Sequence, residues 1–358
     1  NIIHGGLGFN DCDFGMLFIT DYASAPGKEK LFSNSAESII LCIMEYFRRI
    51  QKKMPTGNII IHRKVCDKFV DWSTSEKPLL PIKVDDEMKI EDSPAKFHAD
   101  FANQYIGGGA LHGGCVQEEI LFALKPECYI SMLLCPKMEE NEAIVISGAE
   151  RFSQYSGYAR SLKFEDSFED KTPLNPTLGC LDNHIFCIDA IVNFGNMQFV
   201  KEKLLRDINK AYVGLSRKEE YHTGDDCIAS TGNWGCGAFG GNLELKAIQQ
   251  YIAASELGIP LMYHTFIKPE FAKALEGFGS FCVTNDINVK DVFESLLAYK
   301  PNEVQNEVFN DCIKFIAQKR GIKVPIYEPQ VEEPPTKEAP ASNECNTATE
   351  EQVQKEET

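Results

Sequence analysis

Short apolar runs of strand-like character alternate with amphipathic helical segments along most of this chain. In the helical segments the apolar residues recur every three or four positions, as Leu204, Ile208 and Tyr212 do. Strands that alternate with helices predict an α/β fold whose mostly parallel sheet is covered by helices on both faces. The expected strands lie within residues 58–65, 98–106, 142–148, 184–192, 227–231 and 259–266. The expected helices lie within residues 197–214, 243–257 and 288–299.

The two ends of the chain differ from this pattern. Asn34 and Glu37 have the spacing of a helix-capping box, and 39–47 is apolar on nearly every face, which predicts a buried helix. From about residue 324 the chain is rich in Pro, Glu, Thr and Ser and has too few apolar residues to offset the entropy of ordering. We therefore expect residues 324–358 to form a disordered acidic tail.

The charge of the chain limits its partners. Its net charge is -17, of which the nine Glu and two Lys of residues 324–358 contribute -7, so the rest of the chain carries -10. An acidic body argues against direct binding to DNA. No run of eighteen apolar residues indicates a membrane partner, and the start lacks the pattern of a secretory signal.

The thirteen cysteines are scattered, and no two of them form a C-x-x-C pair. This distribution favours reduced thiols in a cytoplasmic or nuclear protein over disulfides or a zinc site. Cys115 and Cys236 are expected to be small packing residues. His98, His184 and His264 fall in strand-like runs and are expected in the core, and we expect no metal.

A glycine-rich stretch at 230–241, STGNWGCGAFGG, follows an expected strand and precedes an expected helix. Gly235, Gly237 and Gly240 match G-x-G-x-x-G, in which main-chain amides and a helix N-terminus can hold a diphosphate. A tight strand-to-helix turn explains three spaced glycines equally well. A dinucleotide oxidoreductase would also need an acidic ribose contact after the next strand, but that strand ends in Phe266, Ile267 and Lys268.

A second glycine-rich stretch places two carboxylates beside flexible backbone. It reads GGGALHGGCVQEE from Gly107 to Glu119, and its helix is expected to begin near Val116. Carboxylates in a first helical turn commonly do no more than complement the helix dipole. Since neighbouring helical residues point about 100° apart, at least one of Glu118 and Glu119 must turn toward the glycine loop or the core. A carboxyl with a raised pKa beside a phosphate-binding loop indicates general acid catalysis on a nucleotide sugar.

Taken together, these motifs resemble the poly(ADP-ribose) glycohydrolase family. Glycines followed at a fixed distance by Gln-Glu-Glu are similar to the signature of that family, and further stretches match it in order over roughly residues 31–300. These stretches are YFRRIQKKMPTG (46–57), VDDEMKIED (84–92), DFANQYIGGG (100–109), FSQYSGYA (152–159), NKAYVG (209–214), STGNWGCGAFGG (230–241) and YHTF (263–266).

The resemblance implies a macrodomain, which is a mixed sheet between helices, occupying residues 56–323. Residues 1–55 then correspond to a truncated remnant of the family's helical accessory region. The family cleaves the ribose–ribose O-glycosidic bonds of poly(ADP-ribose) and releases ADP-ribose, with no cofactor. The alternative is an ADP-ribose reader without catalysis, which would not need a carboxylate at position 119.

The resemblance also assigns roles to individual residues. Glu119 corresponds to the general acid and base, Glu118 to the group that holds ribose hydroxyls, and Asp100 and Asn103 to residues that orient the site. The implied substrate contacts are Ile90 and Glu91 at the adenine, the main chain of Gly107, Gly108 and Gly109, the side chain of Gln117, Tyr158 on the adenosine and phosphates, the main chain of Asn233, Trp234, Gly235, Cys236, Gly237, Ala238 and Phe239 at the diphosphate, and Phe266 at the distal ribose.

The remaining expectations concern partners and neighbouring residues. The implied substrates are poly(ADP-ribose) and ADP-ribosylated proteins, acted on by a monomer in the nucleus or the cytoplasm as part of the DNA damage response. Tyr155 is expected to pack rather than bind, and His112 is expected to be incidental.

Overall fold

The computed structural model describes residues 34–192, 195–216, 228–301 and 307–323. The chain divides into two units, residues 1–322 and 323–358, and every described helix and strand belongs to the first. The predictions for residues 1–30 and for the acidic tail lie outside the described residues.

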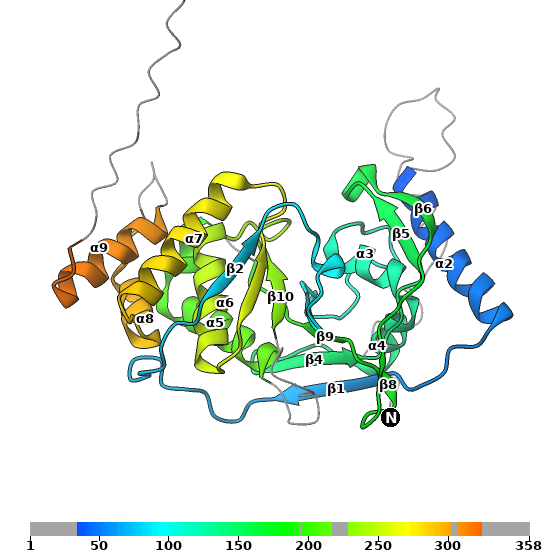
Figure 1. The fold of residues 1–358 in the computed structure, drawn as a ribbon, viewed down its shortest axis with the longest axis horizontal. Coiled ribbons are helices and arrows are strands. Elements are labelled where there is room, and N and C mark those ends of the chain that lie inside the picture. Colours follow the sequence, from blue (N-terminus) through cyan, green and yellow to red (C-terminus); the bar gives the residue numbers. More distant parts are fainter. Residues whose placement is uncertain (1–33, 193–194, 217–227, 302–306, 324–358) are drawn as a thin grey trace, which may run out of the picture. The chain divides into compact units, whose positions relative to one another are not determined.

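A mixed sheet forms the centre of the first unit (Figure 1). Its strand order within the described residues is β1-β4-β9-β3-β10-β11-β2. The strands from β9 to β2 run parallel, whereas β4 is antiparallel to both β1 and β9. The prediction of a mixed, mostly parallel sheet is therefore confirmed. The bounds are β1 Ile60–Val65, β2 Ile82–Asp85, β3 Phe97–Asp100, β4 Glu142–Ser147, β9 His184–Cys187, β10 Ala229–Gly232 and β11 Leu261–His264.

Both faces of the sheet are buried, because successive side chains of each strand enter different cores. Val145 joins the core under one layer of helices, while its neighbours Ile144 and Ile146 join the core on the opposite face. Strands β3, β9 and β10 are buried at all four positions. This burial includes polar side chains, such as Asp100 of β3 and Ser230 and Thr231 of β10.

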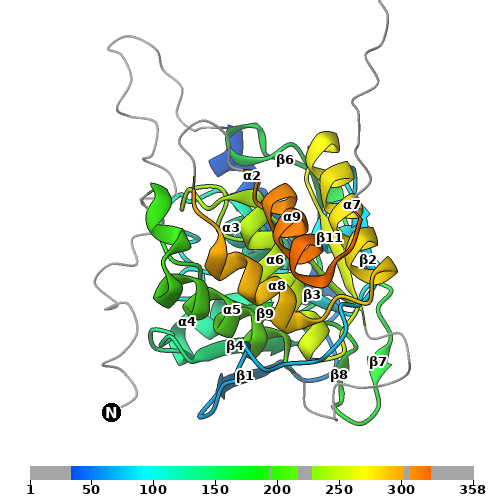
Figure 2. The same ribbon diagram turned by 90° about the vertical axis from the view of Figure 1, so that its left-hand side faces the viewer.

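Helices cover each face (Figure 1). The larger layer, which faces the viewer in Figure 2, contains α5 Lys201–Leu215, α6 Leu243–Glu256, α8 Val289–Ala298 and α9 Val308–Arg320, with α7 Pro269–Thr284 beside them. The other layer contains α3 Gln117–Leu124 and α4 Ile130–Leu134, against which α2 Asn34–Lys52 packs. Two hairpins complete the described part, β5 Ser153–Ser156 with β6 Lys163–Ser167 and β7 Leu174–Asn175 with β8 Cys180–Leu181. Short 3-10 helices are η2 Ile90–Asp92, η3 Pro126–Tyr129, η4 Ala159–Ser161 and η5 Gly195–Phe199.

The predicted helix over 39–47 exists, but the prediction that it is buried on all faces was wrong. Ile39 and Cys42 pack into a core with α3, whereas Leu41, Met44 and Phe47 are 42%, 60% and 55% exposed. Within the described part of the chain, α2 packs on α3 and on the β5–β6 hairpin, and these exposed side chains lie on the rest of its surface. No described helix has the length and apolarity needed to cross a lipid bilayer.

Candidate active site

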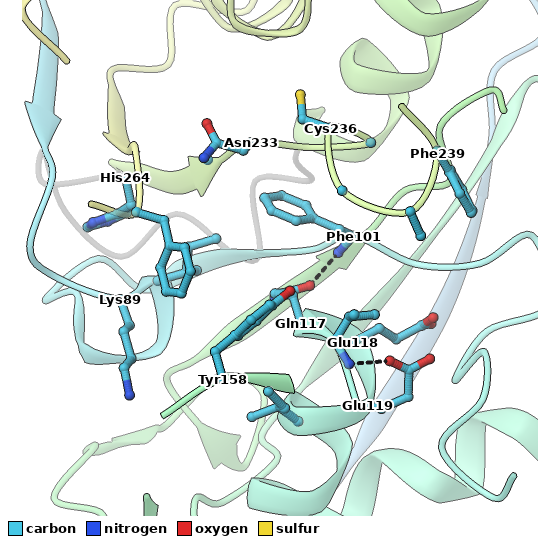
Figure 3. A pocket seen from close by; sticks show the side chains of 18 of the residues that line it. Lys89, Phe101, Gln117, Glu118, Glu119, Tyr158, Asn233, Cys236, Phe239 and His264 are labelled. Atoms are coloured by element: carbon cyan, nitrogen blue, oxygen red, sulfur yellow. Dashed lines mark hydrogen bonds between the residues drawn. The ribbon is translucent and has the colours of Figure 1, made fainter. Parts of the chain in front are cut away.

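A cavity of about 710 Å³ opens at the carboxyl ends of the parallel strands β3, β10 and β11. In open α/β sheets this edge is where ligands bind. Both glycine-rich stretches line the cavity, Gly108 and Gly109 from the first and 235–237 from the second. The two glycine-rich loops therefore share one site. Figure 3 shows Asn233, Cys236 and Phe239 of the second loop across from Gln117, Glu118 and Glu119.

The loop that follows β3 holds the carboxylate of Glu118 by its main chain. The N–H of Asn103 donates to Oε2 at 2.9 Å, and the N–H of Gly107 donates to Oε1 at 2.6 Å. The side chain projects from the first turn of α3 and is 3% exposed (Figure 3). These two hydrogen bonds from main-chain N–H groups fix the orientation of the Glu118 carboxylate.

Glu119 is held in the same way, by a different part of the loop. Its Oε1 accepts the N–H of Gly109 at 2.9 Å, and its Oε2 accepts the N–H of Val116, the residue before α3, at 2.9 Å. A Cβ atom on Gly114 would lie 2.8 Å from the carboxyl carbon of Glu119, so the loop passes this close because residue 114 has no side chain. The lack of space for a side chain at position 114 therefore explains why a glycine stands there, beside the carboxylates.

A third carboxyl, Asp100, ends β3 below the other two and is fully buried. Burial raises its pKa to about 7, a shift that the Cys187 thiol opposes and the charge of Glu119 reinforces. Burial, followed by the charge of Asp100, also raises the pKa of Glu118 well above its usual value. Burial therefore favours the protonated forms of Asp100 and Glu118.

Gln117 connects the first turn of α3 to the end of β3. Its Oε1 accepts the N–H of Phe101 at 2.8 Å, and its Nε2 donates to the carbonyl of Ala99 at 3.0 Å. The amide thus continues the hydrogen-bonding pattern of the strand beyond Asp100. Gln117 also lines the cavity, although the polar atoms of its side chain already bind the main chain.

Aromatic side chains form another part of the cavity lining. The hydroxyl of Tyr155 donates to Oε1 of Glu91, and the ammonium of Lys89 lies 3.6 Å from the centre of the Tyr155 ring. Tyr155 lines the cavity and positions Glu91, in addition to the packing expected from sequence. Tyr158 and Phe266 also line the cavity, and the centres of their rings are 5.0 Å apart.

The second glycine-rich loop presents main chain to the cavity. Within the described part of the chain, the N–H groups of Gly235, Gly237, Ala238 and Phe239 make no hydrogen bond. Gly235 has φ +70°, and a Cβ atom there would lie 2.6 Å from the Cβ of Ala190, so both conformation and space require glycine. Free amides on a loop before a helix suit an anion such as a diphosphate.

Most predicted site residues line the cavity. Asp100, Gly107 and Trp234 do not; Asp100 and Gly107 lie beneath it, and the Trp234 indole is buried and donates to the carbonyl of Ile188 at 3.0 Å. Lining residues that the sequence analysis did not single out as binding are Met88, Lys89, Phe101, Val116, Ile120, Tyr155, Gly232, Gly241, Leu243, His264 and Lys268. Nearly all of them adjoin a predicted motif, and that adjacency is the signal that could have identified them.

The histidine predictions agree with the structure, since His98, His184 and His264 are all buried, although His264 also lines the cavity. The ten described cysteines are free thiols, among them Cys115 and Cys236, which are partly buried. No group of three or more His, Cys, Asp and Glu side chains within the described ranges is arranged to hold a metal ion.

Comparison with known proteins gives consistent matches. The family model described as poly(ADP-ribose) glycohydrolase (PARG), Macro domain fold, matches residues 69–273, which is more than half of the chain. Poly(ADP-ribose) glycohydrolase 1 of Arabidopsis thaliana is 33% identical over 363 residues, covering 82% of this chain and 65% of the relative. Poly(ADP-ribose) glycohydrolase 2 of Caenorhabditis elegans is 33% identical over 269 residues, covering 70% of this chain and 54% of the relative. The chain thus spans less than two thirds of either relative.

Among solved structures, poly(ADP-ribose) glycohydrolase from Thermomonospora curvata is 14% identical with a TM-score of 0.39, covering 74% of this chain and 96% of that one.

Proposed function

This chain belongs to the poly(ADP-ribose) glycohydrolase family, and on that premise we propose that it hydrolyses the ribose–ribose O-glycosidic bonds of poly(ADP-ribose) and releases ADP-ribose. The observation that carries the proposal is the meeting of three features at one cavity. Two buried carboxylates, Glu118 and Glu119, face a loop with free amides, and the rings of Tyr155, Tyr158 and Phe266 line the same cavity. These features suit a scissile sugar bond, a diphosphate and a nucleobase respectively.

In the proposed mechanism Glu119 acts first as acid and then as base. Its protonated carboxyl gives a proton to the ribose oxygen that leaves, while the bond between this oxygen and the anomeric carbon breaks. The resulting carboxylate then takes a proton from water as the water oxygen attacks the anomeric carbon. The proton returns to Glu119, and the products are ADP-ribose and a polymer shortened by one unit. The main-chain amides of Gly109 and Val116, which bind both oxygens of Glu119, hold it in place for both steps.

The remaining residues bind and orient the substrate. Glu118 holds ribose hydroxyls, and Asp100 and Asn103 orient the carboxylates from below and beside them. Ile90 and Glu91 contact adenine, a role that the hydrogen bond from Tyr155 to Glu91 supports. The contacts proposed for the other parts of ADP-ribose are Tyr158 on the adenosine, the main chain of 233–239 on the diphosphate and Phe266 on the distal ribose.

The partners proposed are poly(ADP-ribose) and ADP-ribosylated proteins. We propose that the protein acts on them as a monomer. The free thiols support a reducing compartment, either nucleus or cytoplasm. Residues 56–323 are proposed as the catalytic domain and 1–55 as the remnant of an accessory region.

The test is incubation of the purified protein with labelled poly(ADP-ribose), followed by separation of free ADP-ribose from polymer. Release of ADP-ribose supports the proposal. Retention of the polymer without release would identify a reader instead, and the absence of both binding and release would contradict the choice of ligand.

A further inference from the structure

Behind the 233–241 loop lies a cluster of buried charged side chains that the proposed mechanism does not use. Arg206, Asp207 and Lys210 come from α5, Lys246 comes from α6, and Asp189 follows β9. Their side chains are at most 11% exposed. With three cations and two carboxylates, this cluster carries a net positive charge inside a strongly acidic protein.

Each of the two lysines in the cluster is paired with one aspartate. Lys246 pairs with Asp207, and Lys210 Nζ lies 2.8 Å from Oδ1 of Asp189. Arg206 pairs with both of these carboxylates. Removal of either lysine therefore leaves its carboxylate still paired with the same guanidinium.

On the other side the two lysines differ. Lys246 Nζ lies 4.8 Å from the centre of the Trp234 ring and 3.8 Å from the place that a Cβ atom would occupy on Gly235. Its ammonium thus lies directly behind the turn that begins the diphosphate loop. Lys210 instead donates to the carbonyls of Glu139 and Glu142, at 2.6 Å and 2.7 Å, before β4 and at its start.

The charge of Lys246 acts on the loop itself. Burial raises the pKa of the Cys236 thiol to about 12, and the charge of Lys246 is the first of the influences that oppose this rise. A buried cation is screened far less by salt than an exposed one, and the low dielectric of the interior strengthens its field. Lys246 can therefore favour an anion above the loop without touching it.

We propose that Lys246 is a positioning residue for the diphosphate, which supports the Trp234–Gly235 turn from behind and adds a buried positive charge to the phosphate site. This inference rests on the proposed function insofar as that function places a diphosphate on the 233–239 main chain. Two groups would then favour an anion in the cavity. The main-chain amides of the loop contact it directly, and the Lys246 ammonium acts from behind the loop.

The test compares ADP with adenosine, since the two ligands differ by the diphosphate alone. Dissociation constants for both are measured by calorimetry or by NMR titration on the parent chain, Lys246→Met and the matched control Lys210→Met. In Lys246→Met, ADP binding is expected to weaken about tenfold while adenosine binding changes by less than about twofold. In Lys210→Met the ratio of the two dissociation constants should stay at the parent value, because Lys210 does not contact the loop.

Three outcomes would overturn the inference. These are an equal loss for both ligands in Lys246→Met, the same ADP-specific loss in Lys210→Met, and a parent chain that binds ADP no more tightly than adenosine. If Lys246→Met does not fold, the double variant Lys246→Met with Asp207→Asn removes both charges of the pair. It should still show an ADP-specific loss, smaller than tenfold because the lost carboxylate charge offsets part of the lost positive charge. Hydrolysis of poly(ADP-ribose) by the parent is measured separately, so a chain that prefers ADP but releases no ADP-ribose contradicts the proposed function and not this inference.

Discussion

Glu118 and Glu119 are adjacent in α3, yet both carboxylates end beneath one loop. Neighbouring helical side chains diverge by about 100°, which allowed the sequence to predict that at least one of them turns inward. The structure turns both inward, because the 103–116 segment covers the start of the helix and offers separate main-chain donors to each. A residue pattern cannot specify that path, since it depends on where β3 ends.

We predict that Glu119→Gln abolishes most of the hydrolysis and preserves binding. The amide keeps the size of the side chain but cannot exchange the proton, so kcat should fall by about 10²–10⁴-fold. Affinity for ADP-ribose should stay within a few-fold of the parent, as measured by calorimetry. Parent-like turnover by this variant would remove Glu119 from its proposed role.

Gly114→Ala should impair catalysis through Glu119. The new methyl group would lie 2.8 Å from the carboxyl carbon of Glu119 and so displace it, and kcat should fall at least about tenfold. The control is Gly277→Ala in α7, where a Cβ atom meets nothing within 4 Å; it should leave kcat unchanged and stabilise the helix by up to about 1 kcal/mol. Steady-state kinetics on both variants measure kcat, and equal kcat values for Gly114→Ala and Gly277→Ala would contradict this prediction.

The buried carboxyl of Asp100 predicts a pH-dependent stability. Since its pKa rises from 3.8 in the unfolded chain to about 7 in the folded one, the folded protein holds a proton that the unfolded chain releases. The free energy of unfolding contributed by this group is therefore highest below pH 4, falls as the pH rises, and is lost above about pH 7.

Asp100→Asn removes this dependence. Between pH 5 and pH 8 the parent should lose on the order of 2–3 kcal/mol more stability than the variant. Urea unfolding at both pH values measures the difference. Parallel losses in parent and variant would mean that Asp100 is ionised in the folded protein throughout this range.

Among the secondary-structure elements, the junction of β3 and α3 depends on one side chain. Gln117 satisfies the N–H of Phe101 and the carbonyl of Ala99, both at the end of a buried strand. Gln117→Leu leaves these groups without their partner and should cost roughly 2–3 kcal/mol of unfolding free energy. Gln117→Glu keeps the acceptor for the Phe101 N–H but turns a carboxylate oxygen toward the Ala99 carbonyl oxygen, so it should also destabilise the fold. The prediction fails if chemical denaturation shows parent-like stability for either variant.

The helices and strands predicted from the sequence are those whose apolar residues recur regularly and form a buried face. α5, α6 and α8 were expected within a few residues of their observed bounds. α7, α9 and β2 were not predicted, and neither were the two hairpins. β2 is a four-residue edge strand with no fully buried position, so its sequence carries little of the apolar pattern on which prediction relies.

At the scale of the whole molecule, the acidic charge should slow the approach of a polyanion. Removing residues 324–358 takes away a charge of -7. We predict that this truncation speeds association with poly(ADP-ribose) at low salt and that the difference vanishes near 0.5 M salt, where the Debye length is about 4 Å. Stopped-flow binding measures the rates.

The control for the truncation is the full chain with the nine tail glutamates changed to glutamine, which preserves length and removes charge. It should bind as fast as the truncated chain. A slower rate, or a fall of several degrees in melting temperature on truncation, would show that the tail acts through contacts rather than through its charge.

The sequence by itself determined the α/β class, the two glycine-rich loops, the Gln-Glu-Glu turn and the family, because periodicity, glycine spacing and helix starts are local properties. Tertiary structure alone decided which groups meet. It placed Tyr155 on Glu91 and set Lys246 behind Gly235. These contacts join segments from about 10 to more than 60 residues apart, and their geometry follows from strand order and helix packing, which no local pattern encodes.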